Sequence, residues 1–126
     1  MGTVVQLKNR INNSYSELKN SVEEKLVLVE EKIKLKLSSN VSLVDEMTNY
    51  HLRTGGKRLR ALLTLGAAKI CGYSKGGRDI NLAACVELIH AATLMHDDVI
   101  DNSKIRRGKK TLNSIWGNQS SILVGD

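Results

Sequence analysis

The 126-residue chain carries a net charge of +6, with 41% hydrophobic residues, 25% charged residues and no proline. This composition is typical of one helical globular domain. It excludes a disordered chain and, because no apolar run reaches about 18 residues, a transmembrane segment. The positive charge forms two short clusters without interleaved aromatic residues, so we expect local anion pockets and no nucleic-acid partner.

The first predicted helix belongs to an amphipathic leader over residues 1–40. Within residues 18–37, apolar side chains recur at spacings of three and four, with Glu and Lys between them. This is the pattern of a helix with one buried face. After a polar break, a short second helix is predicted, in which Leu43, Met47 and Tyr50 face inward.

Two further predicted helices are separated by glycines. The third spans about residues 59–70, and the fourth, which is the most apolar, about residues 79–100. A charged loop follows over residues 102–108, and a fifth helix pattern begins near Thr111 and is still running at the last residue. Because no stretch alternates with period two, we predict an all-α fold. Because the last helix lacks a closing signal, we expect the domain over residues 41–126 to be incomplete.

The two cysteines indicate a cytoplasmic protein. Cys71 and Cys85 lie in apolar helical patterns and lack metal-ligand spacing, so we predict buried, reduced thiols. The N-terminal stretch MGTVVQLKNR also lacks the pattern of a secretory signal.

Three carboxylates are concentrated at the end of the fourth predicted helix, where Asp97, Asp98 and Asp101 form a D-D-x-x-D motif. With about 3.6 residues per turn, Asp97 and Asp101 lie one turn apart on the same face. Such carboxylates repel each other unless a cation bridges them. They suit Mg²⁺, which completes its shell with water and substrate phosphate oxygens. A metal site for a diphosphate is one interpretation of the motif, and a solvated helix face is the other.

His90 lies on the same helix face, seven residues before Asp97 and therefore about 10 Å away. This distance is too long for one Mg²⁺ to bind both side chains, and imidazole is a poor Mg²⁺ ligand. His90 is therefore either a contact to a second ligand in the same cavity or a hydrogen-bonded core histidine. His96 is off this face and is expected to be structural.

Two basic motifs can bind phosphate. Arg106 and Arg107 are neighbours in the charged loop, where adjacent side chains diverge, so each can hold a different phosphate group through a bidentate fork. The motif GGKRLR, residues 55–60, leads into a helix start. Its glycines permit close backbone approach, and Lys57 and Arg60 supply positive charge to an anion. A solvated basic turn is the alternative interpretation of this motif.

Together these motifs resemble the amino-terminal part of trans-type polyprenyl diphosphate synthases, of the long-chain bacterial octaprenyl diphosphate synthase kind. The resembling stretches are GGKRLR, ELIHAATLMHDDVIDNSKIRRGKKT and GNQSSILVGD. The resemblance implies an all-α fold around a deep cavity and a Mg²⁺-dependent reaction. An allylic diphosphate ionises, the double bond of isopentenyl diphosphate attacks the carbocation, a proton is lost, and the chain is longer by one isoprene unit.

The resemblance also implies residue roles. The first aspartate-rich motif would consist of Asp97, Asp98 and Asp101, and Asp97 and Asp101 would hold Mg²⁺ against the allylic diphosphate. Arg106 would contact the same diphosphate. The residues that would hold isopentenyl diphosphate are Lys57, Arg60, His90 and Arg107.

Product length is expected to depend on Ala92 and Thr93, which stand five and four residues before Asp97. Short-chain members of the family tend to carry bulky aromatic residues there, so small side chains imply an open tunnel and a long product. Close helix packing is the alternative reason for small residues. A lipid product also implies a location peripheral to the membrane as an alternative to one free in the cytoplasm.

The sequence departs from the family in two ways. Ala61 stands where the family usually has proline. The family chain is also more than twice as long, and its second aspartate-rich motif, which binds the remaining Mg²⁺, has no counterpart here, because Asp126 is the only acidic residue after Asp101. We therefore expect an incomplete synthase that is inactive alone and needs a second polypeptide or a homo-oligomer. The alternatives are a non-catalytic remnant, a helical binding subunit of a full-length synthase and, last, an RNA-binding module.

Overall fold

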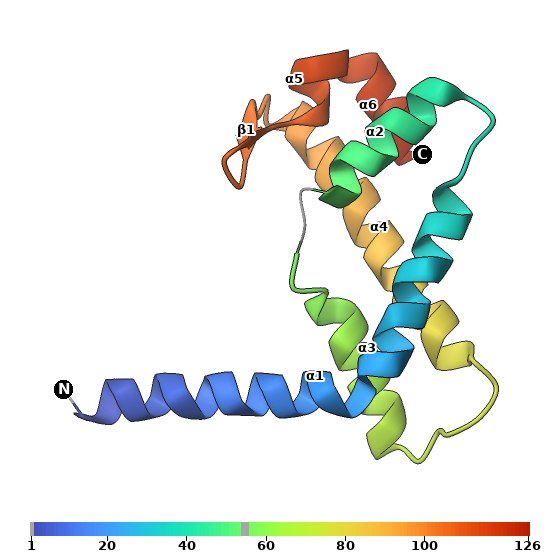
Figure 1. The fold of residues 1–126 in the computed structure, drawn as a ribbon. Coiled ribbons are helices and arrows are strands. Elements are labelled where there is room, and N and C mark those ends of the chain that lie inside the picture. Colours follow the sequence, from blue (N-terminus) through green and yellow to red (C-terminus); the bar gives the residue numbers. More distant parts are fainter. Residues whose placement is uncertain (1, 54–55) are drawn as a thin grey trace.

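A computed structural model describes residues 2–53 and 56–126 of the protein. Within these ranges the chain is mostly helical, as Figure 1 shows, which confirms the predicted all-α fold. The elements are α1 (Gly2–Leu37), α2 (Ser42–Arg53), α3 (Leu59–Ile70), α4 (Arg78–Ile100), β1 (Ile105–Arg106), β2 (Lys109–Lys110), α5 (Leu112–Trp116) and α6 (Asn118–Gly125). Gly55, at the start of the predicted GGKRLR motif, lies outside the described residues. Among the described residues, no helix has both the length and the apolar character needed to cross a bilayer.

The two halves of α1 have different surroundings. The first half projects away from the other elements (Figure 1), and residues 3–14 are all exposed. The second half packs against α3 and α4. Its apolar residues at spacings of three and four are buried or half-buried, with Val29 and Ile33 almost completely enclosed. The apolar face predicted for residues 18–37 is therefore confirmed.

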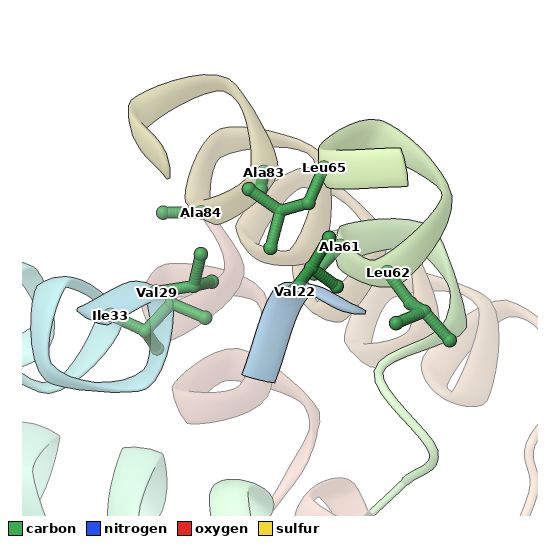
Figure 2. Close-up of a cluster of buried hydrophobic side chains, with 8 residues drawn as sticks. All are labelled: Val22, Val29, Ile33, Ala61, Leu62, Leu65, Ala83 and Ala84. Atoms are coloured by element: carbon green, nitrogen blue, oxygen red, sulfur yellow. The ribbon is translucent and has the colours of Figure 1, made fainter. Parts of the chain in front are cut away.

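The larger hydrophobic core lies between α1, α3 and α4 (Figure 2). Its buried members are Val22, Val29, Ile33, Ala61, Leu62, Leu65, Ala83 and Ala84. Burying each large aliphatic side chain of this kind contributes about 1.5–3 kcal/mol. Gly66 lets α1 and α3 approach closely, because a Cβ at this position would lie 2.8 Å from Cδ1 of Leu18.

A smaller core joins α2 to the C-terminal helices. Met47 of α2, Met95 of α4 and Leu112 of α5 are its buried members. Tyr50 packs edge-to-face on Trp116, with ring centroids 5.3 Å apart. Because α4 contributes to both cores, it connects the two ends of the molecule and fixes the position of the residues on its C-terminal half.

The predicted charged loop over residues 102–108 overlaps a β-hairpin that had not been predicted. Ile105 pairs with Lys110 and Arg106 with Lys109, in antiparallel register. The two turn residues, Arg107 and Gly108, both have positive φ, of 50° and 76°, as in a type I′ turn. Strands of two residues are too short to show the alternation from which a strand is predicted.

The fifth predicted helix is interrupted. Gly117 adopts φ 87° and ψ 161°, a conformation that ends α5 and allows α6 to start in a new direction. The prediction of one continuous helix from Thr111 was wrong, because a glycine can either continue a helix or break it, and local pattern does not decide between the two.

Several burial predictions were wrong. Leu43 is 42% exposed, and Cys71 and Cys85 are free and exposed rather than buried. Cys85 lies on a face of α4 that also presents Leu82 and Ile89 to solvent. No described element covers this face, so apolar residues on it stay exposed.

Candidate functional site

A cleft with a volume of about 690 Å³ opens between the start of α3, the middle of α4 and the β1–β2 hairpin. Five predicted site residues line it: Lys57, Arg60, His90, Arg106 and Arg107. They come from three separate segments, which the packing of α3 against α4 and the return of the chain through the hairpin bring together. The structure therefore gathers all the residues expected at isopentenyl diphosphate, together with Arg106.

Backbone geometry brings two arginines to this cleft. Among the described residues, three non-glycine residues have positive φ, and two of them are Arg58 (φ 47°) and Arg107 (φ 50°), which both line the cleft. Such conformations cost about 1–3 kcal/mol and are concentrated at functional sites. Gly56 lies beside the hairpin, since a Cβ there would be 3.5 Å from Nη1 of Arg107.

The positive charge of the cleft affects its two histidines. Burial lowers the pKa of His90 below its ordinary 6.5, and Arg60 lowers it further, whereas Glu87 opposes the shift. Burial also lowers the pKa of His51, and Arg58 adds to that effect. Both imidazoles are therefore neutral at pH 7, and an anion bound in the cleft would favour their protonated forms.

The three aspartates of the D-D-x-x-D motif do not share one environment. Asp97 and Asp101 are exposed at the end of α4, whereas Asp98 is buried. Nε of Arg106 donates to both carboxylate oxygens of Asp98 at 3.1 Å, and Nη2 donates to Oδ1 at 2.7 Å. This bidentate contact raises the pKa of Arg106. It directs Asp98 towards the hairpin, not towards the other two aspartates.

The carboxylates at the end of α4 determine whether the predicted site could bind Mg²⁺. Among the described residues, no group of three or more His, Cys, Asp or Glu side chains is arranged to hold a metal ion. Asp97 and Asp101 are nevertheless suitable, because they are exposed carboxylates one helical turn apart that form no ion pair with other described residues. Mg²⁺ commonly takes only one or two protein carboxylates and fills its other positions with water and phosphate oxygens. The donor set therefore fits Mg²⁺, and the metal role of the three aspartates stays a prediction.

Arg106 connects the two parts of the candidate site. The three aspartates are not among the residues that line the cleft, but Arg106 lines it and also contacts Asp98. A diphosphate held by the hairpin would thus lie next to the aspartate motif. The Arg106–Asp98 contact had no signal in the sequence beyond the proximity of opposite charges.

Three ionisable side chains of the cleft were not assigned a role from sequence. Arg58 stands inside the GGKRLR motif, and Glu87 precedes His90 by three residues on the same helix, so both had a weak local signal. His51 had none. It reaches the cleft because α2 lies beside α4, and no local pattern predicts that arrangement.

A second, mostly apolar cavity of about 290 Å³ lies between α1, α2, α4 and α6. Ala92 lines it, whereas Thr93 is exposed on another side of α4 and donates its hydroxyl hydrogen to the carbonyl oxygen of His90. The two small residues expected beside a product tunnel therefore have different surroundings. Their role in product length stays a prediction.

His96 has contacts consistent with a structural role. Its Nε2 lies 3.3 Å from the carbonyl oxygen of Ile122 and 3.4 Å from Oδ1 of Asp126. It therefore attaches the end of α6 to α4.

Comparisons of sequence and of structure find similarity to the same group of proteins. The sequence model of the family described as polyprenyl synthetase matches residues 41–126. The octaprenyl diphosphate synthase of Escherichia coli is 47% identical over 90 residues, which cover 71% of this chain and 28% of that protein. The crystal structure of a decaprenyl diphosphate synthase from Rhodobacter capsulatus matches with a TM-score of 0.83 and 44% identity, over 89% of this chain and 34% of that one.

A similar structure was solved with ligands. The polyprenyl synthase of Caulobacter crescentus, in complex with calcium and isoprenyl diphosphate, matches with a TM-score of 0.84 and 40% identity. This match also covers 89% of the present chain and 34% of that one. The chain thus spans about a third of the length of the proteins that it resembles.

Proposed function

The chain belongs to the polyprenyl synthetase family, and from this premise we propose that it forms the diphosphate-binding part of a Mg²⁺-dependent prenyl-transferring site. The observation that carries the proposal is the cleft in which two basic segments and His90 of α4 meet beside the D-D-x-x-D motif. The chain spans about a third of the length of its relatives, so we propose that the cleft is one part of a larger site.

Isopentenyl diphosphate is the proposed ligand of the cleft. Lys57, Arg60 and Arg107 supply charge-assisted hydrogen bonds to phosphate oxygens, and arginine can do so in bidentate fashion. His90 donates a further hydrogen bond once a nearby anion has raised its pKa. A compact anion suits this site better than a nucleic-acid strand, because the basic residues surround one cleft rather than follow an extended stripe.

The allylic diphosphate is the proposed ligand at the end of α4. Asp97 and Asp101 would hold Mg²⁺, which when bound neutralises the diphosphate and assists its departure. Arg106 would contact the same diphosphate, with its guanidinium oriented by Asp98. The related Caulobacter crescentus structure, which contains calcium and isoprenyl diphosphate, supports a divalent cation and a prenyl ligand for this family.

The proposed reaction breaks the C–O bond of the allylic diphosphate, and the electron pair leaves with the diphosphate. The double bond of isopentenyl diphosphate forms the new C–C bond, and a proton is then lost. The residues of this chain bind and orient the two substrates. A carbocation also requires a cavity that excludes water, and the cleft described here is open, so we expect the chain to be inactive alone.

A second candidate function is a helical binding subunit. It is favoured by the exposed apolar side chains of α3 and α4, among them Leu63, Ile89 and Ile100. Patches of this kind mark protein interfaces. In this alternative the chain binds a full-length synthase and does not contribute catalytic residues.

The test is Mg²⁺-dependent condensation of isopentenyl diphosphate with farnesyl diphosphate, with product length as the readout. We expect no turnover by the 126-residue chain and turnover after a polypeptide with the second aspartate-rich motif is added. Asp97→Ala should then lower the rate at least about a thousandfold, because metal stabilisation of the leaving group supplies several kcal/mol.

The matched control is Glu23→Ala, which removes an exposed carboxylate of α1 and should leave turnover unchanged. Full turnover by Asp97→Ala in the completed assembly would contradict the proposed site. If the chain binds a full-length synthase and Asp97→Ala in the chain does not change the rate of that synthase, the result would favour the binding-subunit function.

A further inference from the structure

Glu87 is a buried carboxylate that lines a cleft otherwise rich in cations. Its Oε1 accepts a hydrogen bond from the backbone N–H of Ala61 at 3.0 Å, and its Oε2 lies 3.7 Å from Nη1 of Arg58. A negative charge at this position repels a diphosphate. Its presence in an anion-binding cleft therefore calls for a role other than ligand contact.

The first contact of Glu87 completes the start of α3. The first N–H groups of a helix have no partner within the helix, and the N-cap residue, Arg58, makes no side-chain hydrogen bond to them. Glu87 supplies an acceptor from α4. Proline, which the resemblance led us to expect at position 61, has no N–H to donate, so this contact depends on Ala61.

The second contact of Glu87 holds a residue with an unfavourable backbone conformation. Arg58 has φ 47° and lies between two acidic side chains from different helices. Nε of Arg58 donates to Oε1 of Glu30 at 2.5 Å, and Nη2 donates to Oε2 of Glu30 at 3.4 Å. Glu30 of α1 and Glu87 of α4 thus hold the guanidinium from two directions.

The position of Arg58 determines where its neighbours point. Lys57 precedes it and Arg60 follows at the start of α3, and both line the cleft. If Arg58 left the left-handed region, the backbone on either side would rotate, and both cations would be displaced. The charge of Glu87 is therefore coupled to the geometry of the basic motif through Arg58.

We infer that Glu87 is a positioning residue of the diphosphate cleft, and that it acts by holding Arg58, so that Lys57 and Arg60 are oriented for the ligand. The inference rests on the proposed function, because it takes the cleft as a diphosphate site. It assigns a role in binding to a residue that does not touch the ligand.

The experiment measures the binding of inorganic pyrophosphate to the full chain by isothermal titration calorimetry. Glu87→Gln keeps an oxygen that accepts the Ala61 N–H but removes one of the two negative charges that hold Arg58. We expect the dissociation constant to rise about tenfold. In an Arg58→Ala background, the same substitution should change it less than about twofold, because a residue that acts through Arg58 has no further effect once Arg58 is gone.

Two matched variants separate this role from a purely structural one. Asp79→Asn removes another buried, ion-paired carboxylate of α4, which contacts Lys25 far from the cleft lining, and should leave pyrophosphate affinity unchanged. Ala61→Pro removes the N–H donor but keeps the charge pair, and should change affinity less than about twofold. If Glu87→Gln lowers pyrophosphate affinity equally in the wild-type and Arg58→Ala backgrounds, the inference is wrong. It is also wrong if Ala61→Pro lowers the affinity and Glu87→Gln does not.

A second measurement keeps the inference testable if pyrophosphate does not bind the wild-type chain, a result that would count against the proposed function. The Nη1–H signals of Arg58, which face Oε2 of Glu87, should exchange slowly with solvent in an ¹H–¹⁵N spectrum of wild type and of Asp79→Asn, and at least about tenfold faster in Glu87→Gln. An equally slow exchange in Glu87→Gln would show that Glu87 does not hold Arg58.

Discussion

The two faces of α4 have different surroundings. The packed face contributes its buried residues to both cores and to ion pairs: Ala83, Ala84, Glu87, Met95 and Asp98. The open face presents large apolar side chains to solvent, with Leu82, Ile89 and Ile100 between 56% and 79% exposed. Asp97 and Asp98 are neighbours in sequence but lie on different faces, one exposed and the other buried.

This difference shows how one helix can serve two purposes. Single exposed apolar residues are ordinary, but Leu82, Ile89 and Ile100 repeat along one face that also carries Asp97. A face of this kind is expected to be covered by another polypeptide surface. The packed face supplies stability to the present chain, and the open face leaves large apolar side chains available for contact.

The largest effect should come from removing a side chain of the packed face. Met95→Ala leaves a cavity in the smaller core, where Met95 is 6% exposed, and should lower the free energy of unfolding by about 2–5 kcal/mol. The matched substitution Ile89→Ala on the open face should change it by less than about 0.5 kcal/mol. Urea unfolding followed by circular dichroism measures both, and equal losses would contradict the distinction between the faces.

The neighbouring aspartates provide the next comparison. Asp98→Asn weakens a buried bidentate contact with Arg106 and should lower the free energy of unfolding by about 1.5–3 kcal/mol. Asp97→Asn removes an exposed charge and should leave stability unchanged, although we expect it to abolish Mg²⁺ binding. Thermal unfolding with and without Mg²⁺ separates the two roles. If Asp97→Asn lowered stability and Asp98→Asn did not, the structural role would belong to Asp97 and not to Asp98.

A third prediction concerns acid stability. Burial opposes ionisation of Asp79, but the hydrogen bond and charge of Lys25 together with the backbone N–H of Ile80 outweigh burial and lower the pKa of Asp79 below 3.8. The unfolded chain therefore binds this proton more readily, so the stabilisation is present above about pH 4 and is lost as pH falls through the folded pKa. Asp79→Asn should be less stable than wild type at pH 7 and lose less stability below pH 4. If the free energies of unfolding of wild type and Asp79→Asn fall in parallel as the pH is lowered, this prediction is wrong.

The smallest predicted effect is the uptake of a fraction of a proton by His90 when an anion binds in the cleft. The pKa of His90 is lowered by burial and by the arginines of the cleft, so an anion that raises this pKa should cause proton uptake near pH 6.5. Calorimetric titration with pyrophosphate in buffers of different ionisation enthalpy measures that uptake. His90→Gln should reduce it, and because pyrophosphate contributes equally to both proteins, the difference isolates the histidine. Identical uptake would place His90 away from the ligand.

Much of the candidate site could be predicted from the sequence. The D-D-x-x-D motif, His90 and the two basic motifs were recognised from residue type and spacing, and five of these residues do meet in one cleft. Whether residues 1–40 and 41–126 act as separate units, and which side chains bind metal or substrate, stay predictions. The contacts of Glu87 and Arg58 were not predictable, because they join residues from different helices.

The sequence by itself determined the helical character of the chain, the buried face of α1 and the placement of Asp97 and Asp101 on one side of α4. These follow from a repeat of about 3.6 residues, which is a local property of the backbone. Only the tertiary structure decided that Asp98 is bound by Arg106 and that Cys85 and Ile89 are exposed. Burial and pairing depend on which other element lies against a helix face, and residue spacing within that helix does not contain this information.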